Sequence, residues 1–155
     1  MTIGLLIADD HKLIRAALRR VLNLSDLTIV GEAATPAEAL RLALDPQVQV
    51  MLLDIRWSNG DPTHSCDAGL ELLEEILSRR AELPILMYSG ISEWAYVKRC
   101  RELGARGYLV KGADEAQLVK AVRTVYAGEQ IWPDGGGTSG QARQRAVRAP
   151  ERPAP

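Results

Sequence analysis

Hydrophobic residues occur in short, nearly continuous runs that alternate with segments in which they recur at helical spacing. Continuous runs are typical of parallel strands buried on both faces, so we predict five such strands and expect none to be half-exposed. The predicted strands are Ile3 to Ala8, Leu27 to Ala33, Val48 to Leu53, Ile85 to Ser89 and Gly107 to Val110. The alternation predicts an α/β fold, a doubly wound (βα)5 three-layer sandwich with parallel sheet order 2-1-3-4-5.

Helix signals fall between and after these strands. The first helix is expected from Lys12 to about Asn23, and the second has Thr35 as its cap with Pro36 at its first position. The remaining helices are expected at about Leu70 to Arg80, at about Glu93 to Leu103 with Gly104 as its stop, and between the cap Asp114 and Gly128.

Composition limits the classes of protein that the chain can be. Its 155 residues, 46% hydrophobic and 25% charged, suit one globular domain, which we place at residues 1–132. Residues 133–155 are rich in Gly, Arg, Ala and Pro and are predicted to be a flexible linker or disordered tail. The net charge of −1 does not indicate a nucleic-acid or membrane partner.

Targeting and cysteine signals point to a cytoplasmic protein. The first hydrophobic run, Ile3 to Ala8, is too short for a secretion signal or a membrane span. Cys66 and Cys100 are not at spacings typical of zinc sites or disulfide frameworks.

Polar residues lie at the carboxyl ends of four of the predicted strands. Asp9 and Asp10 follow the first strand, Asp54 the third and Lys111 the fifth, while Ser89 ends the fourth. Ligands of open parallel sheets bind at the carboxyl ends of the strands, where these residues are expected to meet. A single aspartate at such a place is most often a turn former, so the prediction depends on the joint placement.

Three carboxylates in one pocket need a compensating cation. An all-oxygen set that leaves room for water suits Mg²⁺. A carboxylate can also act as a nucleophile and form an acyl phosphate. Asp54 is our candidate for that role because it stands alone, whereas Asp9 and Asp10 form a pair suited to hold metal; Lys111 and Ser89 are suited to contact phosphoryl oxygens.

The motifs together resemble the receiver domain of two-component response regulators, a CheY-like, flavodoxin-like fold, over about Ile3 to Trp132. The matching segments are Leu6-Ile7-Ala8-Asp9-Asp10-His11, Leu52-Leu53-Asp54-Ile55-Arg56, Tyr88-Ser89-Gly90 and Gly104-Ala105-Arg106-Gly107-Tyr108-Leu109-Val110-Lys111. The segments Val30-Gly31-Glu32-Ala33 and Val125-Tyr126-Ala127-Gly128-Glu129 look most like the NarL/FixJ-type branch.

This resemblance implies roles for individual residues. It implies that a sensor histidine kinase phosphorylates Asp54, with Mg²⁺ on Asp10, Asp54 and the backbone carbonyl of Arg56, and with Asp9 assisting through metal-bound water. It also implies that Ser89 and Tyr108 switch the face formed by the fourth helix, fifth strand and fifth helix. That face is expected to contact an output domain or a second copy of the chain, in transcription regulation.

Two features depart from the family pattern. NarL/FixJ-type proteins usually continue into a DNA-binding domain, and none follows here, so DNA binding by these residues is not expected; nor is membrane binding. The loop from Trp57 to Ala68 is longer than usual, and Ser58 replaces the usual proline. Because doubling the length of a surface loop costs only about 0.6 kcal/mol, the insertion is expected to be harmless, with a lid beside the site or a changed dephosphorylation rate as the alternatives. A metal site of His64, Cys66 and Asp67 is disfavoured.

Other functions remain as alternatives. A receiver that binds proteins without phosphorylation would keep the fold, but the complete acidic cluster and Lys111 argue against it. A Mg²⁺-dependent phosphohydrolase is less favoured, because the usual second acid two residues after the nucleophile is absent; the chain is therefore not expected to be an enzyme. A flavin or dinucleotide site is disfavoured because no glycine-rich phosphate loop follows the first strand.

Overall fold

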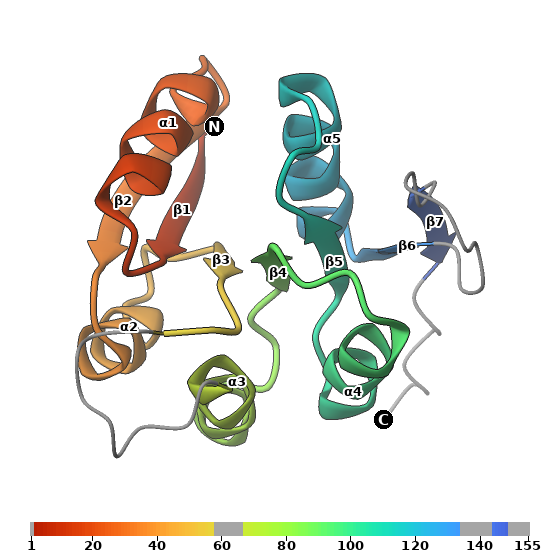
Figure 1. Cartoon of the computed structure of the whole chain (residues 1–155). Coiled ribbons are helices and arrows are strands. Elements are labelled where there is room, and N and C mark those ends of the chain that lie inside the picture. The colour runs from red at the N-terminus through yellow and green to blue at the C-terminus, as the bar shows by residue number, and fades with distance from the viewer. Residues whose placement is uncertain (1, 58–66, 134–143, 149–155) are drawn as a thin grey trace, which may run out of the picture.

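The computed structural model describes residues 2–57, 67–133 and 144–148, the last range by its backbone. Five helices alternate with the strands of one sheet (Figure 1). The strands are β1 (Ile3–Ala8), β2 (Leu27–Ala33), β3 (Val50–Leu53), β4 (Ile85–Ser89), β5 (Gly107–Val110), β6 (Glu129–Pro133) and β7 (Gln144–Arg148). The helices are α1 (Lys12–Leu22), α2 (Pro36–Ala43), α3 (Ala68–Arg79), α4 (Trp94–Leu103) and α5 (Glu115–Tyr126).

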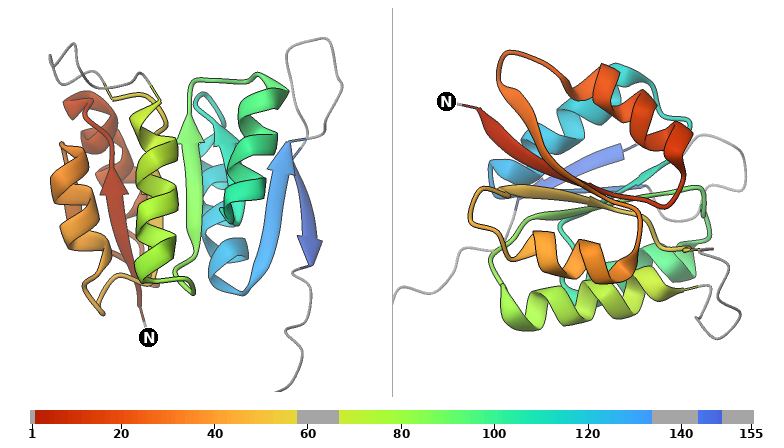
Figure 2. Two further views of the ribbon diagram at one scale, coloured as in Figure 1. Left: turned by 90° about the horizontal axis from the view of Figure 1, so that it is seen from below. Right: turned by 90° about the vertical axis from the view of Figure 1, so that its left-hand side faces the viewer.

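The sheet confirms the predicted order 2-1-3-4-5 and extends it. Its order is β2-β1-β3-β4-β5-β6-β7, in which every neighbouring pair is parallel except β6 and β7. Helices α1 and α5 cover one face of the sheet, and α2, α3 and α4 cover the other (Figures 1 and 2). The result is the predicted doubly wound three-layer sandwich.

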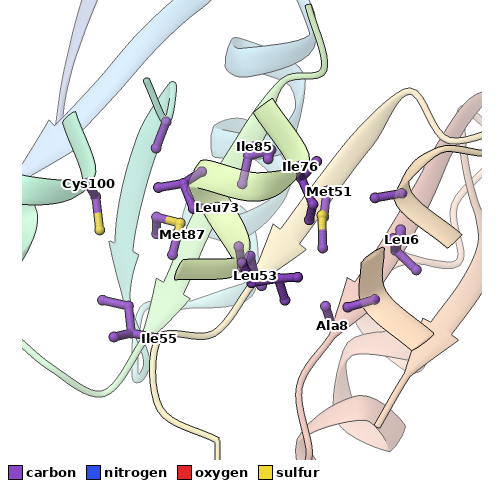
Figure 3. Close-up of a cluster of buried hydrophobic side chains, with 14 of the residues drawn as sticks. Leu6, Ala8, Met51, Leu53, Ile55, Leu73, Ile76, Ile85, Met87 and Cys100 are labelled. Carbon is purple, nitrogen blue, oxygen red and sulfur yellow. The ribbon is translucent and has the colours of Figure 1, made fainter. Parts of the chain in front are cut away.

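Alternating side chains of the central strands supply two hydrophobic cores. Leu6 and Ala8 of β1 face one core while Leu5 and Ile7 face the other, as the two-residue period of a strand requires. On the α3 side, Met51, Leu53, Ile85 and Met87 of the sheet pack with Leu73 and Ile76 of α3 (Figure 3). Both faces of β1 and β3 are therefore buried, which holds their carboxyl ends in place.

The cap signals in the sequence are used as predicted. The Thr35 hydroxyl accepts a hydrogen bond from the Glu38 N–H at 3.2 Å, and Asp114 forms a reciprocal capping box with Gln117. Gly104 ends α4 with φ of +105°, a conformation that favours glycine.

The prediction that no strand is half-exposed was wrong for β2. Residues Thr28 and Val30 of this strand are exposed, because β2 lies at the edge of the sheet and pairs only with β1. The predicted third strand was also too long at its start, because it began at Val48 whereas β3 begins at Val50. Val48 is buried, but its N–H closes a turn onto the Asp45 carbonyl at 3.0 Å instead of joining the sheet.

The polar segment after the domain contains an unexpected strand. Within the predicted tail, residues 144–148 are extended and pair antiparallel with β6 from Glu129 to Pro133. This part of the sequence contains no hydrophobic run, so it gave no signal for a strand. A strand can still form there, because pairing at the edge of a sheet requires only backbone hydrogen bonds. Among the helices of the described ranges, none is long and apolar enough to cross a membrane.

Candidate functional site

Backbone hydrogen bonds bring the predicted polar residues to one edge of the sheet. The Asp9 N–H donates to the Ala33 carbonyl at 3.1 Å, and the Asp54 N–H donates to the Ala8 carbonyl at 3.0 Å. These bonds continue the parallel ladders one residue beyond each strand. The aspartates are therefore held by the sheet itself and do not depend on a loop.

Lys111 lies between two of the carboxylates. Its Nζ is 2.7 Å from Asp9 Oδ2 and 3.0 Å from Asp54 Oδ2, and its own N–H donates to the Ser89 carbonyl at 2.8 Å. Burial opposes the charged form of Lys111, but its hydrogen bond to Asp9 and the charge of Asp54 outweigh this effect and raise its pKa. The ammonium is therefore charged at neutral pH.

The Asp54 carboxylate is almost fully buried, with 3% of the residue exposed. Burial raises the pKa of Asp54, and the Lys111 charge acts in the opposite direction. Asp54 Oδ1 accepts a hydrogen bond from the Ile55 N–H at 2.8 Å, while Oδ2 is the oxygen that faces Lys111. One oxygen is thus held by the backbone and the other faces the Lys111 ammonium.

The main chain of Asp54 is held as well. The indole Nε1 of Trp57, a buried residue, donates to the Asp54 carbonyl at 2.9 Å. Gly69, in the first turn of α3, donates its N–H to the Ile55 carbonyl at 2.7 Å, and a Cβ at this position would overlap the Asp54 carbonyl oxygen and the Ile55 backbone. Only glycine permits this close approach of α3 to the end of β3.

His11 is a further member of the site, one that the sequence analysis did not identify. Its Nδ1 lies 2.7 Å from Asp9 Oδ1 and 3.1 Å from Asp10 Oδ1. Single ligand atoms of Asp9, Asp10, His11 and Asp54 all lie within 4.8 Å of one another. The only sequence signal was the position of His11 directly after the aspartates, where the start of α1 turns the side chain back over them.

The donor set fits a divalent cation. Asp9, Asp10 and Asp54 carry three negative charges when ionised, and Lys111 in contact with two of them carries one positive charge, which leaves a net charge of two negatives. Clustered carboxylate oxygens at this density are stabilised by a cation, and the set matches the oxygen preference of Mg²⁺. The contribution of the Arg56 carbonyl to such a site stays a prediction.

Ser89 and Tyr108 meet beside the site through a shared neighbour. The Ser89 Oγ accepts a hydrogen bond from the Ile91 N–H at 3.3 Å, and the Tyr108 hydroxyl donates to the Ile91 carbonyl at 2.6 Å. Tyr108 is fully buried, and burial raises the pKa of its hydroxyl. The two predicted switch residues are thus connected through the backbone of Ile91, to which both side chains hydrogen-bond.

The structure therefore brings together the side chains of four predicted site residues, Asp9, Asp10, Asp54 and Lys111. Ser89 lies beside them through its carbonyl, which accepts the Lys111 N–H, and the Tyr108 hydroxyl reaches the same strand end through Ile91. Of the disfavoured loop ligands, His64 and Cys66 lie outside the described residues. Asp67 accepts a hydrogen bond from the Tyr96 hydroxyl of α4 at 3.2 Å.

Comparison with known proteins gives a consistent match. The response regulator receiver domain model matches residues 5–123. The response regulator UvrY of Escherichia coli strain K12 is 33% identical over 129 residues, which cover 83% of this chain and 56% of UvrY. The chain thus spans about half the length of the curated relatives it matches.

Solved structures agree. The chain is similar to a LuxR-family response regulator from Aurantimonas sp. SI85-9A1, with a TM-score of 0.73, 27% identity and coverage of 84% of this chain and 89% of that one. It is also similar to the receiver domain of the NarL regulator of Mycobacterium tuberculosis, with a TM-score of 0.69, 32% identity and coverage of 82% and 98%. The chain belongs to the response regulator receiver family of two-component signalling systems.

Proposed function

We propose that Asp54 accepts a phosphoryl group from the phosphohistidine of a sensor histidine kinase. The observation that carries this proposal is the contact between Lys111 Nζ and Asp54 Oδ2 at 3.0 Å, inside a cluster whose carboxylates lie at two neighbouring strand ends. A buried carboxylate beside one ammonium and a cation site has the environment that phosphoryl transfer requires.

The transfer step is a substitution at phosphorus. An Asp54 carboxylate oxygen forms a bond to phosphorus while the bond from phosphorus to the donor imidazole nitrogen breaks. The electron pair of that bond stays on the nitrogen, and the product is an acyl phosphate on Asp54. In this proposal Lys111 would pair with one phosphoryl oxygen, and the Ser89 hydroxyl would donate to another.

A divalent cation would be held by Asp10, Asp54 and the Arg56 carbonyl, with Asp9 assisting, and Mg²⁺ is the proposed ion. When bound, it neutralises charge on the phosphoryl oxygens during transfer. The chain's own contribution is to hold the carboxylate oxygens at the strand ends before the phosphodonor arrives.

The output is proposed to be a change of the α4-β5-α5 face. Ser89 would shift toward the phosphoryl group. Because Ser89 and Tyr108 both hydrogen-bond to Ile91, this shift would be passed on to Tyr108 of β5. The partners proposed for this face are an output domain or a second copy of the chain. Control of transcription would need a DNA-binding domain in a longer form.

The proposal is tested with a small phosphodonor. The purified chain is incubated with acetyl phosphate and Mg²⁺ and its intact mass is followed, with Asp54→Asn and a metal-chelated sample beside it. We expect one phosphoryl adduct in the wild type and none in either control. An adduct on Asp54→Asn, or none on a folded wild-type protein, would contradict the proposal.

A further inference from the structure

The His11 imidazole lies among the carboxylates of the site. A side chain in this position could serve either as a counter-ion for the carboxylates or as a ligand of a bound metal ion. The side chain is half exposed, so it reaches the site from the solvent side. Its Nδ1 lies 2.7 Å from Asp9 Oδ1, 3.1 Å from Asp10 Oδ1 and 3.9 Å from Asp54 Oδ2. The nitrogen therefore faces three carboxylates that come from two different strand ends.

These separations match the edges of a metal coordination shell. In an octahedral site with bonds of about 2.1 Å, neighbouring ligand atoms lie roughly 3.0 Å apart and opposite ones roughly 4.2 Å apart. The distances from Nδ1 to Asp9 and Asp10 are close to the first value, and the distance to Asp54 approaches the second. One cation placed among these atoms can thus contact the imidazole and the carboxylates together.

The backbone holds the ring in this orientation. The His11 N–H donates to Asp9 Oδ1 at 2.8 Å, and the His11 carbonyl accepts the Arg15 N–H at 3.1 Å as α1 begins. The Arg15 guanidinium in turn donates to the Asp9 carbonyl at 2.7 Å. The segment from Asp9 to Arg15 is therefore closed on itself, which places Nδ1 over the cluster before any ion binds.

We propose that His11 Nδ1 is a nitrogen ligand of the cation held by Asp10 and Asp54, and that it shifts this site toward first-row transition cations. The inference rests on the proposed function for the existence of the cation site. Mg²⁺ takes oxygen ligands, whereas imidazole suits cations such as Ni²⁺, so the His11 ring adds more affinity for Ni²⁺ than for Mg²⁺.

The alternative role of His11, as a counter-ion for the carboxylates, makes a different prediction. If His11 served as a positive counter-ion for the carboxylates, an incoming cation would have to displace it. Removing the side chain would then increase the affinity for Ni²⁺ and Mg²⁺ alike, because a competing charge would be lost. The direction of the change in affinity therefore separates the two roles.

The experiment measures metal binding directly, without a phosphodonor. Tag-free wild-type protein, His11→Ala and the matched control His64→Ala are titrated with Ni²⁺ and with Mg²⁺ by calorimetry in one buffer at one pH. We expect His11→Ala to lose at least about tenfold in Ni²⁺ affinity, the lower end of what loss of a supporting group costs, and less than about threefold in Mg²⁺ affinity. His64→Ala should change neither.

A second readout identifies the ligand atom. Pulsed electron paramagnetic resonance of bound Mn²⁺ should show coupling to one ¹⁴N nucleus in the wild type and in His64→Ala, and no such coupling in His11→Ala. Equal Ni²⁺ affinities of wild type and His11→Ala, tighter binding in His11→Ala, or nitrogen coupling that survives this substitution would overturn the role of His11. A wild-type protein that binds no divalent cation would instead contradict the proposed function.

Discussion

Asp54 is positioned through its main chain as much as through its carboxylate. The Trp57 indole and the Asp54 carbonyl form one contact, and the ladder bond from the Asp54 N–H to Ala8 forms another. The close approach of Gly69 to the Asp54 carbonyl adds a third constraint. A small displacement of the Asp54 backbone would therefore move the carboxylate oxygens that are proposed to react. A misplacement of about 1 Å can cost about a hundredfold in rate.

Gly69→Ala is the substitution that tests this constraint. The added methyl group overlaps the backbone of Asp54 and Ile55, so we expect a loss of about 1–3 kcal/mol in the free energy of unfolding and slower phosphorylation by acetyl phosphate. Gly90→Ala is the control, because a Cβ there meets no atom within 4 Å. Urea unfolding measures the first effect, and equal losses in both variants would contradict the account.

We expect the buried thiol of Cys100 to make the free energy of unfolding decrease at alkaline pH. Burial raises the pKa of this thiol to about 12 from a usual value of 9.0, so the unfolded chain releases the proton first as the pH rises. The stabilising effect of the buried thiol is complete below pH 9 and is lost progressively up to about pH 12. The loss is at most about 1.4 kcal/mol per pH unit.

The measurement compares urea unfolding of wild type and Cys100→Ala at pH 8 and pH 10. We expect the wild type to lose more stability between these two pH values than Cys100→Ala does. A parallel decline in both proteins would show that other groups, such as the buried Tyr108, account for the alkaline sensitivity.

At the scale of the elements, one arginine joins the end of α3 to the segment between α2 and β3. The Arg80 guanidinium donates to three backbone carbonyls, those of Ala43 at 2.9 Å, Asp45 at 3.0 Å and Val48 at 2.7 Å. The Ala43 carbonyl belongs to the last turn of α2, where such groups lack partners within the helix. Arg80 thus caps α2 and sets the entry into β3.

Arg80→Ala should lower the free energy of unfolding by about 1–3 kcal/mol, because charge-assisted hydrogen bonds to partly buried carbonyls are lost. The neighbouring Arg79 is the matched control, since among the residues that the structure describes its side chain pairs only with Glu75, in an exposed ion pair at 3.1 Å. Arg79→Ala should change stability by about 0.5 kcal/mol or less. Thermal and urea unfolding of both variants check the difference, and similar losses would refute the capping role.

The elements that the sequence predicted well are those whose signal is local. Strands β1 and β4 have the predicted bounds because hydrophobic runs bounded by polar residues mark them, and α5 begins at the cap that Asp114 and Gln117 form. The exposure of β2 and the pairing of residues 144–148 were missed, since both depend on which strand lies at the edge of the sheet. Position at an edge is a property of the whole sheet.

The same distinction applies to the site. Asp9, Asp10, Asp54, Ser89 and Lys111 follow from the rule that parallel strand ends share one edge, so their meeting could be predicted. The approach of His11 and the fit of Gly69 could not, because each depends on how a helix begins against a neighbouring backbone. Such contacts have no spacing pattern in the sequence.

At the scale of the whole molecule, the site and the proposed output face are joined by the central sheet. β3 carries Asp54 and pairs with β4, and β4 carries Ser89 and pairs with β5, which carries Tyr108. Trp94 at the start of α4 is exposed, so the proposed output face offers an aromatic side chain to a partner. A change at Asp54 is therefore two strands away from the surface that is proposed to read it.

The central claim is that Asp54 is the residue that receives the phosphoryl group. The most direct test is to phosphorylate the protein with acetyl phosphate and Mg²⁺ and then reduce it with borohydride, which converts an aspartyl phosphate to homoserine. Peptide mass analysis then reads the position of the modified residue. The account predicts homoserine at position 54 alone, and homoserine at position 9 or 10, or at no aspartate of a folded, phosphodonor-treated protein, would contradict it.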